Sequence, residues 1–149
     1  MNIGTGTSII HLPVESPPRR LTGTAIGGGT FEGLANLILG RTYGDADRFV
    51  EYLNIGLGGK LDMMSMVVKD IFGGNSPYKG LDESIVASSF SKVRVGQEYR
   101  DADIVRNLAF MVSVSVAQVG VISAMANNIP TIVFTGNYSI KHEVVLDTL

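Results

Sequence analysis

Two glycine-rich segments near the start of the chain have the composition of a phosphate-binding site. Residues 2–8 read Asn-Ile-Gly-Thr-Gly-Thr-Ser, and residues 27–30 read Gly-Gly-Gly-Thr before an apolar run at helical spacing. Glycine lacks a Cβ atom, so its backbone N–H group can come close to a small ligand. The first N–H groups of a helix also favour an anion, because the helix dipole places partial positive charge there. The two segments together predict a nucleotide or phosphoryl site.

Each segment also has a simpler interpretation. A tight turn between two strands explains residues 4–8 equally well, although the hydroxyl groups of Thr5 and Ser8 are suited to donate to phosphate oxygens. Three successive glycines are an unfavourable way to begin a helix, because each one costs backbone entropy on folding. The triplet at 27–29 therefore favours a close approach to a ligand over a plain helix start.

The elements that would position these segments follow from the hydrophobic pattern. Residues 8–14 and 19–24 read as strands, and the Pro-Pro turn between them predicts an antiparallel hairpin. Thr30 can cap a helix that ends at Gly40. The apolar face of that helix is expected to comprise Phe31, Leu34, Leu37 and Ile38. Further helices are expected at 45–53, 61–72, 101–127 and from 138 onwards, with a loop at 73–80 and a short buried strand at 131–135.

Composition limits the class of protein. The chain has 149 residues, 45% of them hydrophobic and 17% charged, with a net charge of −2, which is typical of one globular domain. Its charges form no basic stripe or polybasic segment, so we expect no nucleic acid and no membrane as partner. The apolar residues 108–126 are interrupted by serine, glutamine and glycine, which favours a buried helix over a membrane span. Cysteine is absent, the two histidines are isolated, and no metal-ligand spacing occurs. A cytoplasmic location is the expectation.

Five ordered motifs resemble the type II (eukaryotic-like) pantothenate kinases. Residues 2–8 and 20–31 are similar to that family's two central glycine signatures. Downstream, residues 69–74 (Lys-Asp-Ile-Phe-Gly-Gly), 85–90 (Ile-Val-Ala-Ser-Ser-Phe) and 132–137 (Ile-Val-Phe-Thr-Gly-Asn) resemble further family segments in the same order. The resemblance covers almost the whole chain.

The resemblance implies an α/β fold, namely one lobe of the acetate-and-sugar-kinase/heat-shock-70/actin (ribonuclease H-like) fold, in incomplete form. Residues 1–149 would be a single partial domain, the C-terminal lobe of a pantothenate kinase, with the N-terminal lobe absent. In this family the general-base glutamate and a second phosphate loop lie earlier in the chain. We therefore expect no catalytic residue within this sequence, and no turnover by this chain alone. Family members are dimers, which implies a homodimer.

The implied activity is ATP-dependent phosphorylation of pantothenate to 4'-phosphopantothenate, the first step of coenzyme A biosynthesis, with ATP and Mg²⁺ as cofactors. The resemblance assigns nucleotide contacts to Gly4, Thr5, Gly6, Ser8, Gly27, Gly28, Gly29, Thr30, Phe31, Tyr43 and Asn137, with the two aromatic residues beside the adenosine. It assigns the region of pantothenate and of the feedback ligand acyl-coenzyme A to Arg20, Phe72, Val86 and Ala87. The fork of a guanidinium group suits a carboxylate or a phosphate, which supports Arg20. Ordinary core packing explains the three apolar residues equally well.

Two other functions remain open. Residues 59–65, and Val114 with Ser115, depart from the family pattern, which motivates a non-catalytic homologue (a pseudokinase) that binds acyl-coenzyme A or a nucleotide. A sugar or N-acetylhexosamine kinase of the same superfamily would share the glycine turns. The Ala-Ser-Ser-Phe box at 87–90 argues against that reading.

Overall fold

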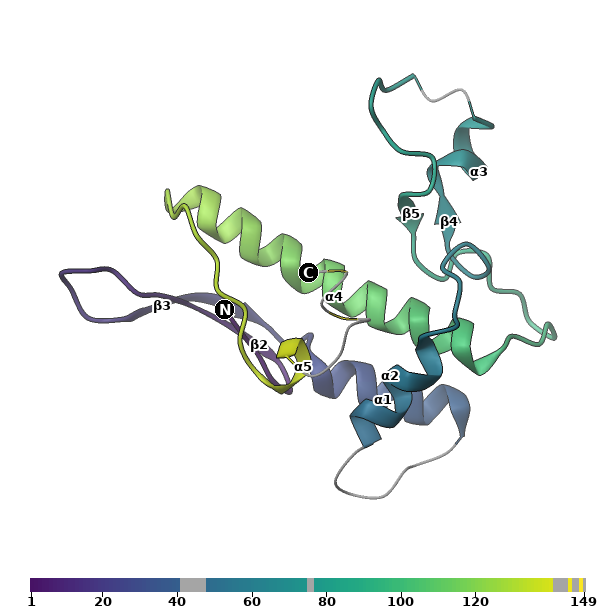
Figure 1. Ribbon diagram of the computed structural model, residues 1–149, viewed down its shortest axis with the longest axis horizontal. Helices are drawn as coiled ribbons and strands as arrows, with labels where there is room; N and C mark the ends of the chain where they lie inside the picture. The colour runs from purple at the N-terminus through teal and green to yellow at the C-terminus, as the bar shows by residue number, and fades with distance from the viewer. Residues whose placement is uncertain (41–47, 75–76, 141–144, 146–147, 149) are drawn as a thin grey trace.

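The computed structural model describes residues 1–40, 48–74 and 77–140, together with 145 and 148. Within these residues the chain is a mixed α/β structure with a three-stranded sheet, a separate two-stranded sheet and helices. One long helix runs through the middle of the molecule, and the two sheets lie on different parts of it (Figure 1).

The first sheet is built from the glycine turn and the hairpin that the sequence predicts. Strands β1 (Asn2–Ile3), β2 (Thr7–His11) and β3 (Arg19–Thr24) pair antiparallel in the order β1-β2-β3. The hairpin is confirmed, although β2 is shorter than the expected strand at 8–14. A register shift between Ile9 and Ile10 interrupts its pairing with β3.

Residues 133–135 extend this sheet beside β1 but do not form the buried strand expected there. The N–H group of Ile3 donates to the carbonyl of Thr135 (2.7 Å), and the N–H group of Thr135 donates to the carbonyl of Met1 (2.8 Å). The pairing is limited to a single parallel bridge, between Asn2 and Thr135. Val133 is 64% exposed, so the apolar run at 131–135 did not indicate burial.

Helix α1 (Gly28–Leu39) begins directly after the hairpin. Gly27 is its N-cap, and Thr30 lies in the first turn, where its Oγ1 atom accepts a hydrogen bond from the N–H group of Gly27 (3.2 Å). The prediction that Thr30 is the cap was therefore wrong by three residues, whereas the end at Gly40, with φ 62°, is confirmed. The expected apolar face was also partly wrong. Phe31 and Ala35 are fully buried, but Leu37 and Ile38 are 77% and 48% exposed.

Helix α4 (Asp101–Ala126) confirms the longest predicted helix and carries most of the core. Helix α2 (Arg48–Gly56) packs against it, and Tyr52 and Leu53 of α2 are fully buried. By length and apolar composition α4 could cross a membrane, and 39% of its most apolar window is buried in the structure. One stripe of α4 faces the core, as expected for a buried helix, while Val121, Ile122 and Met125 are exposed.

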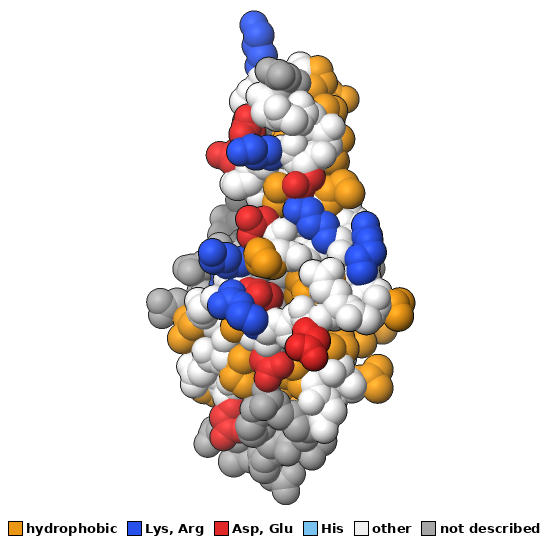
Figure 2. All heavy atoms as spheres, turned by 90° about the vertical axis from the view of Figure 1, so that its right-hand side faces the viewer, with side chains coloured by type: hydrophobic (Ala, Val, Ile, Leu, Met, Phe, Trp, Pro, Cys, Tyr) orange, Lys and Arg blue, Asp and Glu red, His pale blue; other side chains and the backbone are white. Residues whose placement is uncertain are grey.

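The second sheet projects from the body as an arm, residues 66–88 (Figure 1). The arm contains β4 (Met66–Val67), α3 (Val68–Phe72) and β5 (Val86–Ser88), and its sheet is formed by the antiparallel pairing of β4 with β5. The single helix expected at 61–72 was wrong, because a turn and a strand precede a short helix there. Basic and acidic side chains are interspersed over the face of the molecule at this end (Figure 2).

Candidate functional site

A cavity of about 570 Å³ opens where three glycine-containing segments meet. These segments are the turn after β1, the start of α1, and the start of α5 (Asn137–Ile140). The residues that line the cavity are Asn2, Gly4, Thr5, Gly28, Gly29, Glu32, Phe49, Gly136, Asn137 and Tyr138. Residues separated by more than 130 positions are thus neighbours, as the sequence motifs require of a common site.

Close backbone contact between the first turn and α1 explains the glycine triplet. The N–H groups of Gly28 and Gly29 donate to the carbonyls of Gly4 (2.7 Å) and Thr5 (3.0 Å). A Cβ atom on Gly27 would lie 2.8 Å from the carbonyl oxygen of Thr5, closer than real side chains come. The triplet therefore serves contact between two backbone segments. Two of the helix N-terminal donors that the sequence offered to a phosphate are used inside the protein.

Gly136 closes the third side of the cavity. Its φ is 100°, a conformation that L side chains rarely adopt. A Cβ atom at this position would lie 2.4 Å from the carbonyl oxygen of Ile3. Only glycine fits so close to β1, and the turn that follows places Asn137 at the cavity.

Thr7, which the sequence analysis did not single out, fastens the hairpin to the glycine segment. Its side chain is 5% exposed, and its Oγ1 donates to the carbonyl of Ile26 (2.8 Å). The only sign of this role in the sequence is that Thr7 alternates with apolar residues along a strand. Glu32 was also missed, and it is the one acidic residue among the described residues that line the cavity.

The aromatic side of the cavity differs from the expectation. Phe31 is fully buried and does not line the cavity, whereas Phe49 does. The two rings meet edge to face at 5.5 Å, so Phe31 supports Phe49 from behind. Tyr43, the other aromatic residue assigned to the adenosine, lies outside the described residues.

Tyr138 anchors the cavity wall in the core. It is 2% exposed, and its hydroxyl group donates to the carbonyl of Ala109 (3.2 Å) and lies 3.2 Å from Oγ of Ser113. Burial raises the pKa of this phenol above its ordinary value. Tyr138 therefore stays neutral at physiological pH.

Of the eleven residues assigned to the nucleotide, five line the cavity, five lie outside its lining, and Tyr43 is outside the described residues. Gly4, Thr5, Gly28, Gly29 and Asn137 line it. Outside the lining are Gly6, Ser8, Gly27, Thr30 and Phe31. Gly6 lies in the first turn, Ser8 pairs with Gly23 within the sheet, and Gly27 and Thr30 shape the start of α1.

The residues assigned to pantothenate do not meet within one copy of the chain. Arg20 is exposed on β3, in the hairpin. Phe72, Val86 and Ala87 belong to the arm, on the other side of the molecule (Figure 1). In the arm, Phe72 packs edge to face on Tyr78 at 6.0 Å. Val86 is half-buried and Ala87 is exposed.

Comparison with known proteins assigns the family. The family model named Fumble matches residues 1–149, the whole chain. The chain belongs to the Fumble family. Its relatives include the pantothenate kinase of Schizosaccharomyces pombe, 33% identical over the whole of this chain and 37% of that protein, and pantothenate kinase 1 of Arabidopsis thaliana, 33% identical over 39% of that protein. The resemblance to eukaryotic-type pantothenate kinases is thereby confirmed.

The relatives of this chain do not all carry the name of a kinase. A mouse protein named 4'-phosphopantetheine phosphatase is 31% identical over the whole of this chain and 18% of its own length. This chain spans less than two fifths of the length of each of these three relatives.

Proposed function

We propose that this chain forms the nucleotide-binding part of a pantothenate kinase, which transfers the γ-phosphoryl group of ATP to pantothenate and gives 4'-phosphopantothenate. The supporting observation is the convergence of three glycine-containing segments on one cavity, at positions that resemble the motifs of pantothenate kinases. The proposal includes the assignment of residues 1–149 to one lobe of the actin-like kinase fold, the C-terminal one.

The lining of the cavity suits ATP. Thr5 and Asn137 supply a hydroxyl and an amide that can donate to phosphate oxygens, and neither of them carries a negative charge. Phe49 offers an apolar face to the base. The one carboxylate of the described lining, Glu32, would repel phosphate groups, so we place the phosphates towards Thr5 and Asn137.

Mg²⁺ fits this site only together with the nucleotide. Protein-bound Mg²⁺ commonly uses one or two carboxylates and completes its shell with substrate phosphates and water. The described lining offers a single carboxylate, Glu32, and the described residues contain no cluster of three or more metal-ligating side chains. When bound, the ion would neutralise charge on the transferring phosphoryl group.

The substrate side of the proposal requires two copies of the chain. Arg20 would hold the carboxylate of pantothenate with its guanidinium fork, and Phe72, Val86 and Ala87 would contact the apolar part. One copy keeps these groups apart, in β3 and in the arm (Figure 1). We therefore propose a homodimer in which Arg20 of one copy faces the arm of the other. Acyl-coenzyme A, which shares the pantothenate unit, would compete there as a feedback ligand.

Calorimetric titration of the chain with MgATP tests the nucleotide site. We expect saturable binding that ADP displaces, and weaker binding for Thr5→Val, because that change removes a hydroxyl donor from the lining. Thr131→Val is the matched control, since it makes the same change at an exposed position outside this cavity. No binding, or equal binding by both variants, contradicts the proposal. We expect no pantothenate-dependent ADP release from this chain alone.

A second candidate is a non-catalytic member of the family that binds nucleotide or acyl-coenzyme A. The departures from the family pattern at residues 59–65 and at Val114 and Ser115 favour it. Kinase activity in a longer protein that contains this sequence would exclude this candidate. Ligand binding without turnover in that protein would support it.

A further inference from the structure

Three buried polar side chains join the segment before the arm to α4. Ser65 and Asn107 are fully buried, and Asp103 is 2% exposed. Asp103 and Asn107 are one helical turn apart on α4, and both face residues 60–65. Buried polar groups reduce stability unless they are hydrogen-bonded, so their partners show what this cluster does.

Asp103 fixes the beginning of the segment. Its carboxylate accepts a hydrogen bond from the N–H group of Lys60 (2.8 Å) and two from the guanidinium group of Arg100 (2.6 and 2.9 Å). The hydrogen bond from Arg100, followed by that from Lys60, holds the pKa of the Asp103 carboxyl below its ordinary value. The carboxylate is therefore charged, and both of its oxygens have partners.

Asn107 fixes both ends of the segment and sets the direction of the hydrogen bonds. Its Nδ2 donates to the carbonyls of Lys60 (3.0 Å) and Asp103 (2.8 Å). Its Oδ1 therefore faces Ser65, whose hydroxyl group must donate to it (2.5 Å). The oxygen of Ser65 is then left to accept a hydrogen bond, and it accepts one from the N–H group of Phe90 (3.1 Å).

Phe90, which follows the arm, is the last residue of this chain of hydrogen bonds. Its φ is 58°, an uncommon conformation for a bulky residue, and it comes two residues after β5. Its side chain packs against the core, while its N–H group donates to Oγ of Ser65. The strained backbone thus turns at a position that the cluster on α4 defines.

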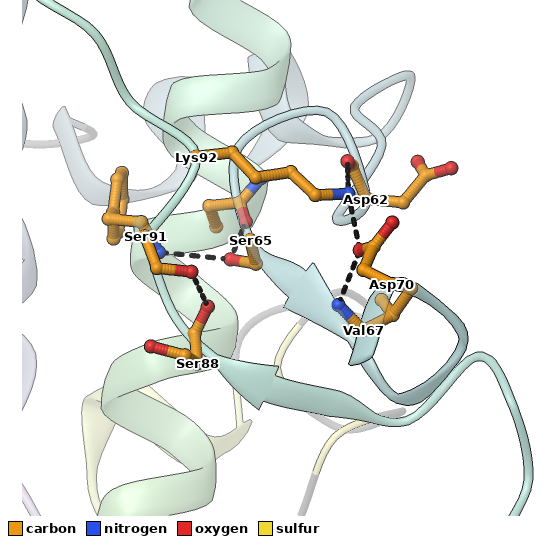
Figure 3. A network of polar contacts seen from close by, with 9 residues as sticks. Asp62, Ser65, Val67, Asp70, Ser88, Ser91 and Lys92 are labelled. Carbon is orange, nitrogen blue, oxygen red and sulfur yellow. Dashed lines mark hydrogen bonds and ion pairs between the residues drawn. The ribbon is translucent and has the colours of Figure 1, made fainter. Parts of the chain in front are cut away.

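Lys92 makes a second connection on the more exposed side of the same joint (Figure 3). Its backbone N–H group donates to the carbonyl of Met64 (2.9 Å), and its Nζ donates to the carbonyl of Asp62 (2.9 Å). The same Nζ pairs with Asp70 Oδ2 at 2.5 Å. Lys92, which follows β5, is therefore joined both to the residues before β4 and to α3.

We propose that Ser65 and Asn107 are positioning residues for the substrate side of the site, because they set the place of Val86 and Ala87 relative to α4. The inference rests on the proposed function, in which these two arm residues contact pantothenate. Ser65 lies within residues 59–65, where the sequence departs from the family pattern. In this chain its role depends on Asn107 of α4, which accepts the hydrogen bond from its hydroxyl group. An apolar pair would fill the same space but would not direct the N–H group of Phe90.

The test compares two ligands in the same variants. Ser65→Ala removes both hydrogen bonds of the hydroxyl group, and we expect about tenfold weaker pantothenate binding, the effect of losing roughly one net hydrogen bond. MgATP binding should change less than twofold. Exchange of the Phe90 amide proton with solvent should become faster. Ser113→Ala is the matched control, because it removes an equally buried hydroxyl group on the cavity side of α4. It should leave the exchange of the Phe90 amide unchanged.

Two results separate this inference from the proposed function. If the unmodified chain binds MgATP but not pantothenate, the pantothenate assignment fails and the inference fails with it. If it binds both ligands, and Ser65→Ala weakens both equally or neither, Ser65 has a structural role only and the inference alone is overturned. Ser65→Cys serves if the alanine variant does not fold, since it keeps the side-chain size while weakening both hydrogen bonds.

Discussion

Replacing Gly27 by alanine tests whether the close backbone contact between the first turn and α1 requires glycine. The new Cβ atom would lie 2.8 Å from Cα of Gly6 and from the carbonyl oxygen of Thr5, and 2.9 Å from that of Gly4. All three are backbone atoms, which cannot rotate away. Overpacking of this kind costs about 1–3 kcal/mol, and the restricted unfolded chain returns roughly 0.4–1 kcal/mol. We therefore expect a net loss of about 1–2 kcal/mol in the free energy of unfolding.

Gly33→Ala is the matched control on the same helix. A Cβ atom there meets no other atom within 4 Å, so alanine should stabilise α1 by about 0.5–1 kcal/mol. Urea unfolding, followed by circular dichroism, measures both variants against the original chain. Gly27→Ala should also weaken MgATP binding, because it pushes the first turn away from α1. If Gly27→Ala is as stable as the original chain, the contact between turn and helix does not need glycine and the reasoning is refuted.

Three further predictions concern other polar groups. Tyr138→Phe removes the hydrogen bonds of the phenol to the carbonyl of Ala109 and to the hydroxyl group of Ser113, and should lower the free energy of unfolding by about 1 kcal/mol. Urea titration measures this loss, and an unchanged value would contradict the two hydrogen bonds. Asp103→Ala should cost about 1–3 kcal/mol in the same titration, because it leaves the N–H group of Lys60 without its acceptor, and a loss below 0.5 kcal/mol would argue against this role. The hydrogen bonds from Lys92 and then from the backbone N–H group of Val67 hold the pKa of Asp70 below its ordinary value of 3.8. The stability that Asp70 contributes is therefore complete above pH 3.8 and is lost as the pH falls through the lowered pKa. The stability difference from Asp70→Asn should therefore shrink in acid, and a difference that is constant with pH would contradict the ion pair.

The sequence was most informative where the local pattern and the final structure depend on the same residues. The hydrophobic period at 101–127 predicts α4 almost to its ends, because a long helix needs only its own backbone hydrogen bonds and one apolar stripe. The Pro-Pro turn and β-branched residues likewise predict the hairpin of β2 and β3. Glycine chemistry predicted a common site for the first two glycine segments, motif resemblance added the third, and the structure places all three around one cavity.

Contacts between distant segments explain what the sequence could not predict. Residues 61–72 have a helical pattern, but Asp103 and Asn107 hold residues 60–65 in another conformation, and Val67 pairs with Val86 instead. The pattern also gave Leu37 a place in the core, whereas the residues that α1 buries are Phe31 and Ala35. Which face of a helix is buried, and which donors a turn uses, depends on partners that are far away in the chain.

The amide spectrum of the isotopically labelled chain during a titration with MgATP tests the nucleotide site most directly. We expect saturable shifts of the amide signals of Gly4, Thr5 and Asn137 with one common dissociation constant, because these residues line the same cavity. A second cavity, of about 550 Å³, is lined by residues of β2, β3 and the segment 127–133, and its signals should stay in place. Shifts confined to that second cavity, or no saturable shift at all, would contradict the nucleotide site at the glycine segments.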